Sequence, residues 1–389
     1  MTRGDHDYRR PTVDIAGLTG PLGERVLAEI RDRLAGAALT DALALRIGTA
    51  LRREYPADLV AEALTQTELR ERAAAKFTRA ERMLLTRAGW EQASPEVVAR
   101  HTAARLPRRV ADLCCGIGGD LLAIAPGREV LAVDRDPVHL ALAEHNAAVY
   151  GGAPQMRLAD VRDVDLAGFD AVFVDPARRS AAGRMRTGES EPPLEWCFAL
   201  PVPTAVKAAP GIGHEVVPAG WEQEFVAVGR ELKEAVLWSP ALATTGARAT
   251  LLPGGETLVA AAGEPVEVRE PGPWLLDPNP AVTRAGAVEE LARRLGAWKI
   301  DERIAFLCTS TRVETPFART LEVLDSGPFD RKRMARRLRE LDIGAVDVRR
   351  RGLGGDVELL QKQLKPRGSR KATLVMTRAR DKAWGLICR

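Results

Sequence analysis

Hydrophobic positions recur at helical spacing over the first hundred residues of the chain. Apolar side chains three and four residues apart follow each other over 22–34 and 58–88, with few β-branched runs, so both segments are expected to be helical. A further helix is expected over 95–106, where Ser94 supplies an N-cap, Pro95 a first helical residue and Glu96 an acid in the first turn. Residues 1–108 are therefore predicted to form an N-terminal helical domain.

From Arg109 onward the pattern changes to short apolar runs that alternate with helical segments. This alternation is typical of a parallel sheet flanked by helices. The expected strands are 110–113, 129–133, 155–159, 170–174 and 203–207, and the expected helices lie near 119–125 and 137–150. Later strands over 224–228, 235–238 and 249–252, with a hairpin turn at Gly254-Gly255, are expected to complete an antiparallel edge. Residues 109–264 are thus predicted to be a Rossmann-like α/β domain.

A proline-rich segment from 264 to 280 marks the next change and predicts a linker or an extended crossing segment. Beyond it a helix is expected over 281–295 and a strand-like run over 304–308. The remaining pattern predicts a strand at 319–324, a helix at 330–341, a strand at 345–350, a helix at 356–364 and strands at 372–377 and 383–388. Residues 265–389 are therefore predicted to be a C-terminal α+β domain.

The composition, 46% hydrophobic and 28% charged, is that of an ordinary globular protein, and 389 residues exceed the usual size of one core. No apolar run approaches the roughly 20 residues of a membrane helix, and no signal peptide is visible, so a cytoplasmic protein without a membrane partner is expected. The five cysteines lack metal-type spacing, so no metal is expected. The oligomeric state stays open.

The charge is distributed unevenly along the chain. Residues 328–389 contain 18 Lys and Arg against 7 Asp and Glu, a net charge of +11. Because the whole chain carries +4, the remainder carries −7. Such asymmetry indicates a polyanionic partner, and the simpler alternative is a solvated charged surface.

The stretch from Val110 to Leu122 carries the clearest chemical motif. A short apolar strand ends in Asp112, and a turn containing Gly116 and Gly118 then opens a helical segment. Glycines let the backbone approach a ligand, and the helix N-terminus offers free N–H groups. Asp134 closes the next strand, where a carboxylate can bind ribose hydroxyls. The motif predicts a nucleotide-type cofactor site.

Acidic residues end four of the predicted parallel strands: Asp112, Asp134, Asp160 and Asp175. Ligands of open α/β sheets bind beyond the carboxyl ends of the strands, so these side chains are expected to share one site. The series resembles class I S-adenosylmethionine-dependent methyltransferases. A Rossmann dehydrogenase also has a glycine turn and a strand-end acid. However, Asp112 before the glycines and Asp-Pro after the fourth strand favour the methyltransferase.

The resemblance implies S-adenosyl-L-methionine as the cofactor and assigns a role to each position. Residues 112–119 would form the methionine-side turn, Asp134 would hold the ribose hydroxyls, and Asp160 would hold the adenine amino group. The cofactor-binding residues that we predict are Asp112, Cys114, Gly116, Gly118, Asp134, Arg135, Asp160, Val161 and Asp175.

The residues after the fourth strand are expected to face the methyl acceptor. A carboxylate and a rigid backbone carbonyl can accept hydrogen bonds from an exocyclic amine, so Asp175, Pro176 and Arg178 are predicted to be catalytic. The motif resembles the Asp/Asn-Pro-Pro-aromatic signature of base-N-methylating enzymes, but Ala177 replaces the second proline and Arg178 the aromatic residue. A simple strand-end turn is the alternative interpretation of Asp175.

The last part of the chain is similar, in element order and in the run Arg349 to Gly352, to the THUMP-like C-terminal domain of bacterial methyltransferases. This resemblance implies RNA as the partner and substrate, and the Asp-Pro turn after the fourth strand favours a base nitrogen as the acceptor. Predicted substrate contacts are Arg179, Lys207, Arg349, Arg350 and Arg351. Two other functions stay open: methylation of a small molecule or protein, and a catalytically silent RNA-binding protein.

Overall fold

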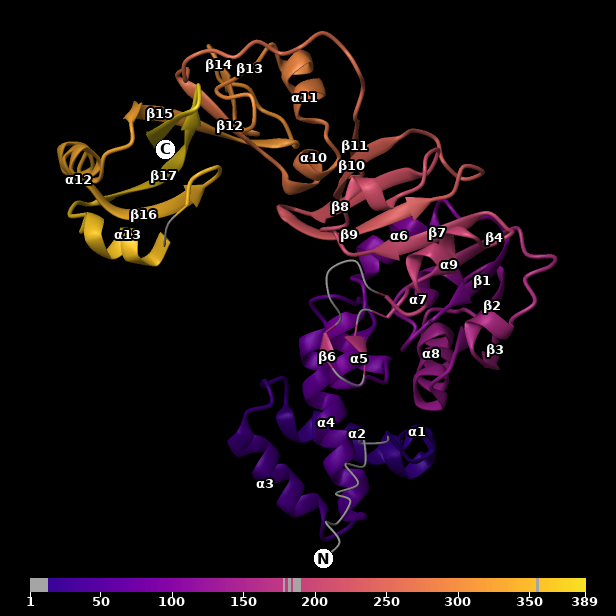
Figure 1. Ribbon diagram of the computed structural model, residues 1–389. Helices are drawn as coiled ribbons and strands as arrows, with labels where there is room; N and C mark the ends of the chain where they lie inside the picture. Colours follow the sequence, from indigo (N-terminus) through magenta and orange to yellow (C-terminus); the bar gives the residue numbers. More distant parts are fainter. Residues whose placement is uncertain (1–12, 178, 181–182, 185–189, 355–356) are drawn as a thin grey trace, which may run out of the picture. The chain divides into compact units, whose positions relative to one another are not determined.

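The computed structural model of the chain describes residues 13–177, 179–180, 183–184, 190–354 and 357–389. The chain folds into two units, Met1–Pro218 with Val236–Leu242, and Ala219–Ala235 with Ala243–Arg389 (Figure 1). Within the described ranges no helix is both long and apolar enough to cross a membrane.

The first unit begins with helices, as the hydrophobic spacing predicts. These are α1 (Ile15–Thr19), α2 (Pro21–Leu34), α3 (Asp41–Leu51), α4 (Ala57–Ala73), the 3-10 turn η1 (Ala80–Arg82), α5 (Arg87–Gln92) and α6 (Glu96–Ala103). The prediction of one helix over 58–88 is wrong, because α4 ends at Ala73. The buried side chain of Gln66 binds both the N–H and the carbonyl of Leu85, and Arg70 donates to the carbonyl of Met83. These tertiary hydrogen bonds replace helical ones in the returning chain.

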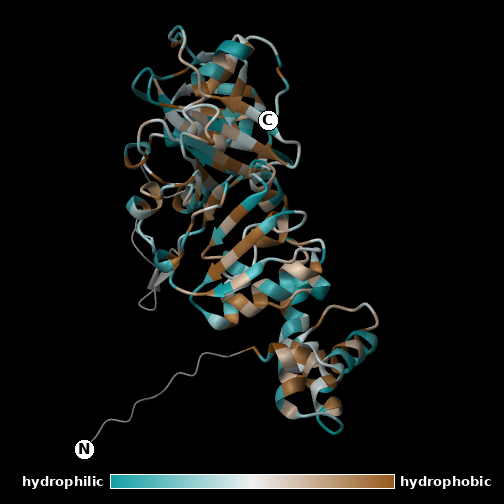
Figure 2. Cartoon of the chain, turned by 90° about the vertical axis from the view of Figure 1, so that its right-hand side faces the viewer, coloured by the Kyte–Doolittle hydropathy of each residue, from teal (hydrophilic) through white to brown (hydrophobic). Residues whose placement is uncertain are grey.

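The parallel sheet of the first unit contains the five strands predicted for it. They are β1 (Arg109–Leu113), β2 (Glu129–Asp134), β3 (Gln155–Leu158), β4 (Ala171–Val174) and β7 (Thr204–Ala208). Their order is β7-β4-β1-β2-β3, and each neighbouring pair is parallel (Figure 1). The strand order therefore reverses between β1 and β4, the place where such sheets bind ligands. Apolar residues run along the buried strands (Figure 2).

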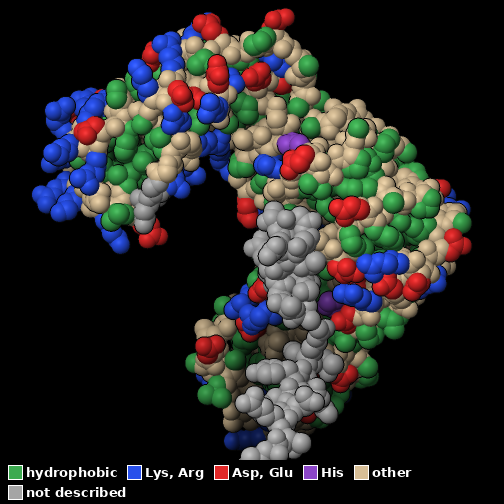
Figure 3. All heavy atoms as spheres, in the orientation of Figure 1, with side chains coloured by type: hydrophobic (Ala, Val, Ile, Leu, Met, Phe, Trp, Pro, Cys, Tyr) green, Lys and Arg blue, Asp and Glu red, His purple; other side chains and the backbone are tan. Residues whose placement is uncertain are grey.

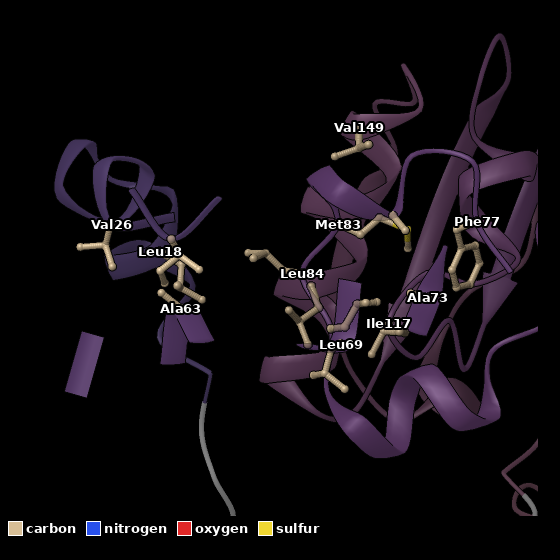
Figure 4. Packing of buried hydrophobic residues seen from close by; sticks show 14 of the residues in the cluster. Leu18, Val26, Ala63, Leu69, Ala73, Phe77, Met83, Leu84, Ile117 and Val149 are labelled. Atoms are coloured by element: carbon tan, nitrogen blue, oxygen red, sulfur yellow. The ribbon is translucent and has the colours of Figure 1, made fainter. Parts of the chain in front are cut away.

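Helices α7 (Leu121–Ile124), α8 (Pro137–Val149) and α9 (Leu194–Phe198) connect these strands, together with η2 (Val161–Asp163), η3 (His214–Val216) and the short pair β5 (Arg179–Ser180) and β6 (Gly183–Arg184). A buried apolar cluster joins the N-terminal helices to this core. Figure 4 shows Ile117, from the turn after β1, among Leu69, Ala73 and Leu84. The N-terminal helices therefore pack directly on the sheet domain of the first unit.

The second unit begins with β8 (Glu222–Val228) and the first part of β9 (Glu231–Trp238), followed by β10 (Ala247–Leu252) and β11 (Glu256–Val259). The expected antiparallel edge is correct for β10 and β11, which turn at Gly255 with φ +78°. It is wrong for β8 and β10, which pair in parallel. Between them the chain runs along β9 and returns through 239–246, which restores the direction of β8.

The rest of the second unit forms a sheet in the order β13-β14-β12-β15-β18-β17-β16. Its strands are β12 (Trp274–Pro278), β13 (Trp298–Lys299), β14 (Leu307–Thr309), β15 (Ala318–Pro328), β16 (Ile343–Arg350), β17 (Arg370–Ala379) and β18 (Lys382–Cys388). Its helices are α10 (Pro280–Arg284), α11 (Val288–Leu295), α12 (Arg331–Glu340) and α13 (Val357–Leu364). The strand and helix order predicted for 319–388 is correct.

Two predictions about this unit need correction. The supposed linker 264–280 contains β12, which pairs with strands on both sides, because its prolines flank the buried pair Leu275 and Leu276 instead of interrupting it. The expected helix 281–295 is divided into α10 and α11 at Gly286, whose φ of +70° a right-handed helix cannot contain.

Candidate active site

The glycine turn after β1 is held in place by β2 and α8. Gly116 donates its N–H to Asp134 Oδ2 at 2.9 Å, and Asn146 Nδ2 of α8 donates to the carbonyl of Ile117 at 2.8 Å. Gly116 and Gly118 have φ values of +55° and +84°, which glycine adopts without strain. The turn is thus fixed by hydrogen bonds from elements on either side of it.

The two glycines of this turn serve different purposes. A Cβ at Gly118 would lie 3.1 Å from Ala143 Cα, so the close approach of α8 leaves no room for a side chain. A Cβ at Gly116 would meet no atom of the described residues within 4 Å. Open space beside a backbone turn at the switch point of a parallel sheet is where a nucleotide-type ligand can approach the main chain.

Three carboxylates and one ammonium group meet beside this turn. Asp112 of β1 is 1% exposed, and neither of its carboxylate oxygens has a hydrogen-bond partner among the described residues. Lys207 of β7 is 4% exposed, and its Nζ lies 2.9 Å from Asp120 Oδ2 and 2.7 Å from Asp175 Oδ2. The register of β1 with β4 pairs Leu113 with Val174, which brings Asp112 and Asp175 to the same sheet edge.

Burial raises the pKa of the Asp112 carboxyl well above its ordinary value, and the negative charges of Asp120 and Asp175 raise it further. Burial likewise raises the pKa of Asp120, although the Lys207 ammonium opposes that shift. Burial is the main cause of both shifts, and the carboxylates also outnumber the one ammonium group beside them. An arrangement with surplus negative charge is suited to a cationic ligand.

The other predicted cofactor residues lie around the same sheet edge. Asp134 ends β2, and its second oxygen accepts the N–H of Asp136 at 2.9 Å, so it braces the turns after both β1 and β2. Arg135 next to it is exposed, whereas Cys114 is half-buried with a φ of +65°. Each carboxylate oxygen has a further lone pair with which Asp134 could accept a hydroxyl.

Asp160 follows β3 and accepts the N–H of Arg162 at 2.9 Å. The guanidinium of Arg162 lies 3.2 Å from Asp160 Oδ2 and 2.6 Å from Glu191 Oε1. Val161 is buried and, with Trp196, lines a cavity of about 550 Å³. A ligand amine at Asp160 would therefore share that carboxylate with Arg162.

The predicted catalytic residues follow β4. The Asp175 N–H donates to the carbonyl of Leu113 at 3.2 Å, and Pro176 is buried. Ala177 pairs with Glu191 through reciprocal backbone hydrogen bonds of 2.9 and 3.0 Å. Arg178 lies outside the described residues, and Arg179 is described only as a backbone residue of β5.

Lys207, a predicted substrate contact, is buried at the end of β7. Its side chain is 3% exposed and is engaged by Asp120 and Asp175, so a contact with substrate would have to compete with both ion pairs. Asp120 is the site residue that sequence reasoning missed. Its signal was an acid two positions after Gly118 at the start of α7, where a helix N-terminus favours negative charge.

The predicted substrate residues of the second unit have separate surroundings. Arg349 lies exposed and pairs with Asp347 at 3.0 Å, and Arg350 next to it is exposed. Arg351 is engaged internally, with Nη2 at 3.0 Å from Asp277 Oδ1 and its guanidinium over the Phe306 ring. A substrate contact by Arg351 would have to compete with these interactions.

A parallel sheet whose order reverses between β1 and β4, with a glycine turn and acidic side chains at the strand ends, matches the fold expected for a class I methyltransferase. Comparison with known proteins agrees with that class. The chain is 37% identical over 336 residues to an uncharacterized S-adenosylmethionine-dependent methyltransferase of Mycobacterium tuberculosis, from strains CDC 1551 and H37Rv, covering 80% of this chain and 91% of the relative. The chain belongs to the family of S-adenosylmethionine-dependent methyltransferases.

Family models match three parts of the chain. Residues 107–165 match RNA cap guanine-N2 methyltransferase, residues 318–389 match the THUMP domain-like family, and residues 12–73 match a domain of unknown function, DUF8688. A crystal structure of a candidate methyltransferase from Porphyromonas gingivalis W83 has the same fold, with a TM-score of 0.72 over 94% of this chain and 98% of that one, at 20% identity. The resemblances to class I methyltransferases and to the THUMP-like domain are confirmed.

The residues around the glycine turn fit S-adenosyl-L-methionine, the cofactor of this family. The cofactor carries an ammonium and a sulfonium, and Asp112 offers two buried oxygens without a partner among the described residues. The open side of Gly116 leaves room for the methionine part of the cofactor. Asp112 would pair with the ammonium, and Asp134 would accept the ribose hydroxyls.

Cofactor affinity is expected to rise with pH and to lose this dependence in Asp112→Asn. Burial raises the pKa of Asp112, so at low pH its carboxyl has to lose a proton before it can pair with the ammonium of the cofactor. The free-energy cost of this deprotonation falls as the pH rises through the raised pKa. At neutral pH the variant should bind the cofactor about 10–100-fold more weakly, the equivalent of a lost charged hydrogen bond. Calorimetric titration between about pH 5 and 7.5, where an amino group stays protonated, measures both effects. Equal slopes in wild type and variant would contradict the assignment.

Proposed function

We propose that this methyltransferase acts on RNA and transfers the methyl group to a base nitrogen. The observation that carries the proposal is the unit around residues 318–389, which is similar to THUMP domains and lies within the strongly basic end of an otherwise acidic chain. Clustered Lys and Arg attract phosphates through counterion release without reading sequence. The likeness of 107–165 to RNA cap guanine-N2 methyltransferase supports the same substrate class.

The proposal gives each part of the chain a task. Residues 1–108 support the glycine turn. Gly89 packs closely against Ile117 of the turn, and Ala93 packs closely against Gly119. Residues 109–264 hold the cofactor and the acceptor. Residues 265–389 recruit RNA. This division is supported by the helical, parallel-sheet and basic α+β character of the three segments.

Asp175 is proposed to orient the acceptor amine. The cofactor supplies the methyl group, so the protein has to align the acceptor lone pair with it and exclude water. Lys207 holds one oxygen of Asp175, while the Asp175 side chain remains 30% exposed at the sheet edge. The carboxylate can then accept a hydrogen bond from an exocyclic N–H, and the buried ring of Pro176 keeps the following backbone rigid. Arg178 and Arg179 would follow as phosphate contacts.

The test is transfer of labelled methyl groups to RNA from a strain that lacks this protein, followed by nucleoside analysis. Wild-type protein is expected to label one methylated nucleoside, and Asp175→Asn should give almost none. RNA from a strain that contains the protein is the matched control, because its sites should already be methylated. Label that enters protein or metabolites and never RNA would overturn the proposal in favour of a different substrate class.

A further inference from the structure

Two arginines from distant parts of the sequence contact one buried carboxylate in the second unit, and two further arginines lie close enough to act electrostatically on the first of them. Asp277 of β12 is 6% exposed; Arg230 Nη2 lies 2.9 Å from its Oδ2, and Arg351 Nη2 lies 3.0 Å from its Oδ1. Arg319 is the cross-strand partner of Asp277 in the β12–β15 ladder. Arg349 precedes Arg351 by two residues and lies on the edge strand β16.

The strand register places Arg319 and Arg349 on one face of the sheet. Directly paired residues of neighbouring strands point to the same side, and so do residues two apart in one strand. Arg349 pairs with Val375, and Arg319 lies two residues from Leu321. Val375 and Leu321 belong to the apolar cluster formed with 300–308, whereas α12 and α13 pack on the other face with Leu374. Arg319 also donates to Thr373 Oγ1 at 3.0 Å. The arginines therefore continue the face that these helices leave uncovered.

Positive charge exceeds negative charge in this group. Among the described residues, Arg230 and Arg351 pair with Asp277, and Arg349 pairs with Asp347 at 3.0 Å. Four guanidinium groups thus stand against two carboxylates, which leaves an excess of two positive charges. Burial lowers the pKa of Arg230 despite the opposing charge of Asp277, and Arg349, Arg319 and Arg351 lower it further. Like charges held together in this way repel each other, and a bound anion would relieve that repulsion.

The more conspicuous basic surface lies elsewhere, over α12 and α13 (Figure 3). There Arg333 and Arg337 both contact Asp325, at 2.6 and 2.8 Å, and Arg337 also pairs with Glu340, so two carboxylates compensate their two charges. Lys332, Arg336 and Arg339 are exposed on the helix. A solvated helix of this kind contributes to the general electrostatic attraction but does not hold converging guanidinium groups in fixed positions.

We propose that Arg230, Arg319 and Arg349 bind the phosphodiester backbone of the substrate RNA, with Asp277 and Arg351 as their rigid support. The inference rests on the proposed RNA methyltransferase function and adds where the strand is held. Guanidinium groups match phosphate oxygens in bidentate geometry, and fixing them in advance reduces the entropy lost on binding. Such contacts position the RNA without reading its bases.

The test compares two charge-matched triple variants of the full-length protein. The first is Arg230→Gln, Arg319→Gln and Arg349→Gln, which leaves Arg351 to pair with Asp277; the second is Lys332→Gln, Arg336→Gln and Arg339→Gln on α12. Binding of labelled small RNA from a strain lacking the protein is followed by fluorescence anisotropy at several salt concentrations. The first variant is expected to bind at least about 10-fold more weakly. Its slope of log K against log salt should be shallower by about 2, since each of the three lost phosphate contacts to a single strand contributes about 0.7. The second should change affinity less than about twofold.

A third variant, Arg230→Lys with Arg319→Lys and Arg349→Lys, separates the effect of lost charge from an effect of misfolding. It is expected to keep the wild-type salt slope but to bind about threefold more weakly, because lysine cannot form the bidentate contact. Unchanged affinity in the glutamine variant of the arginine face, or a larger loss from the α12 variant, overturns this inference and leaves RNA methylation standing. Wild-type protein that neither binds nor methylates RNA overturns the proposed function and this inference together.

Discussion

Asp175→Asn is expected to lower kcat for methyl transfer by about 10²–10³-fold, the decrease typical when one oriented polar partner is removed from a reacting centre. Asparagine keeps the size of the side chain but has only one oxygen. In this chain the Lys207 ammonium, 2.7 Å from Asp175 Oδ2, would attract that oxygen and leave the N–H group facing an acceptor that itself carries N–H. The affinity for the cofactor should stay within about threefold of the wild-type value, because Asp112 and Asp134 are unchanged. Removing a charged hydrogen bond from either of those two residues would weaken binding far more. Single-turnover transfer from labelled cofactor gives the rate, and calorimetry gives the affinity.

Asp170→Asn is the matched control for this experiment. Asp170 lies just before the same strand, β4, at its opposite end, where it is exposed and accepts the N–H of Arg109 at 3.1 Å. This variant should keep wild-type kcat. If Asp175→Asn loses cofactor affinity and activity in equal measure, Asp175 is a cofactor ligand and does not position the acceptor.

Lys207→Met is expected to destabilise the first unit by about 3–5 kcal/mol, the usual cost of removing one partner from a buried ion pair. The substitution leaves Asp120 buried without the ammonium that lies 2.9 Å away in the wild type, beside a carboxylate of Asp112 that already has no partner among the described residues. Amide exchange over β1, β4 and β7 measures the stability of this unit directly, whatever the second unit does.

The double variant Lys207→Met with Asp120→Asn tests the cause. Removing the negative charge should restore more than half of the lost stability, whereas adding Asp170→Asn, on an exposed carboxylate, should restore none. The deficit should also depend on pH. Burial raises the pKa of Asp120 in the folded state, so protonation of Asp120 favours the folded state. The stability lost in Lys207→Met should therefore be smaller at acid pH and should increase as the pH rises through that pKa. A deficit that is independent of both pH and Asp120 would indicate poorer packing instead of uncompensated charge.

Much of the fold follows from local patterns. The strands β1, β2, β3, β4 and β7 lie within a residue or two of their predicted positions. All except β3, a mixed polar and apolar edge strand, are short apolar runs bounded by a charged residue, proline or glycine. The prediction failed where long-range contacts compete with local preference. Helix α4 stops at Ala73 because its own side chains bind the backbone of 83–85, and β12 forms inside a proline-rich segment because its two neighbours pair with it.

Local sequence patterns are enough to predict the class of enzyme and the acids expected around its cofactor turn. An acid after each apolar strand is a local signal, and parallel strands bring their carboxyl ends to one edge wherever they pair. Which of the charges meet depends on long-range packing. Lys207 and Asp120 are 87 residues apart, and nothing in the pattern around either residue indicates that the lysine is buried or that it holds Asp175. Similarly, Arg230 meets Asp277 and Arg351 only because strands far apart in the sequence converge in the second unit. Local sequence specifies where strands begin and end, whereas ion pairs and pKa values depend on distance and burial, which only the folded chain defines.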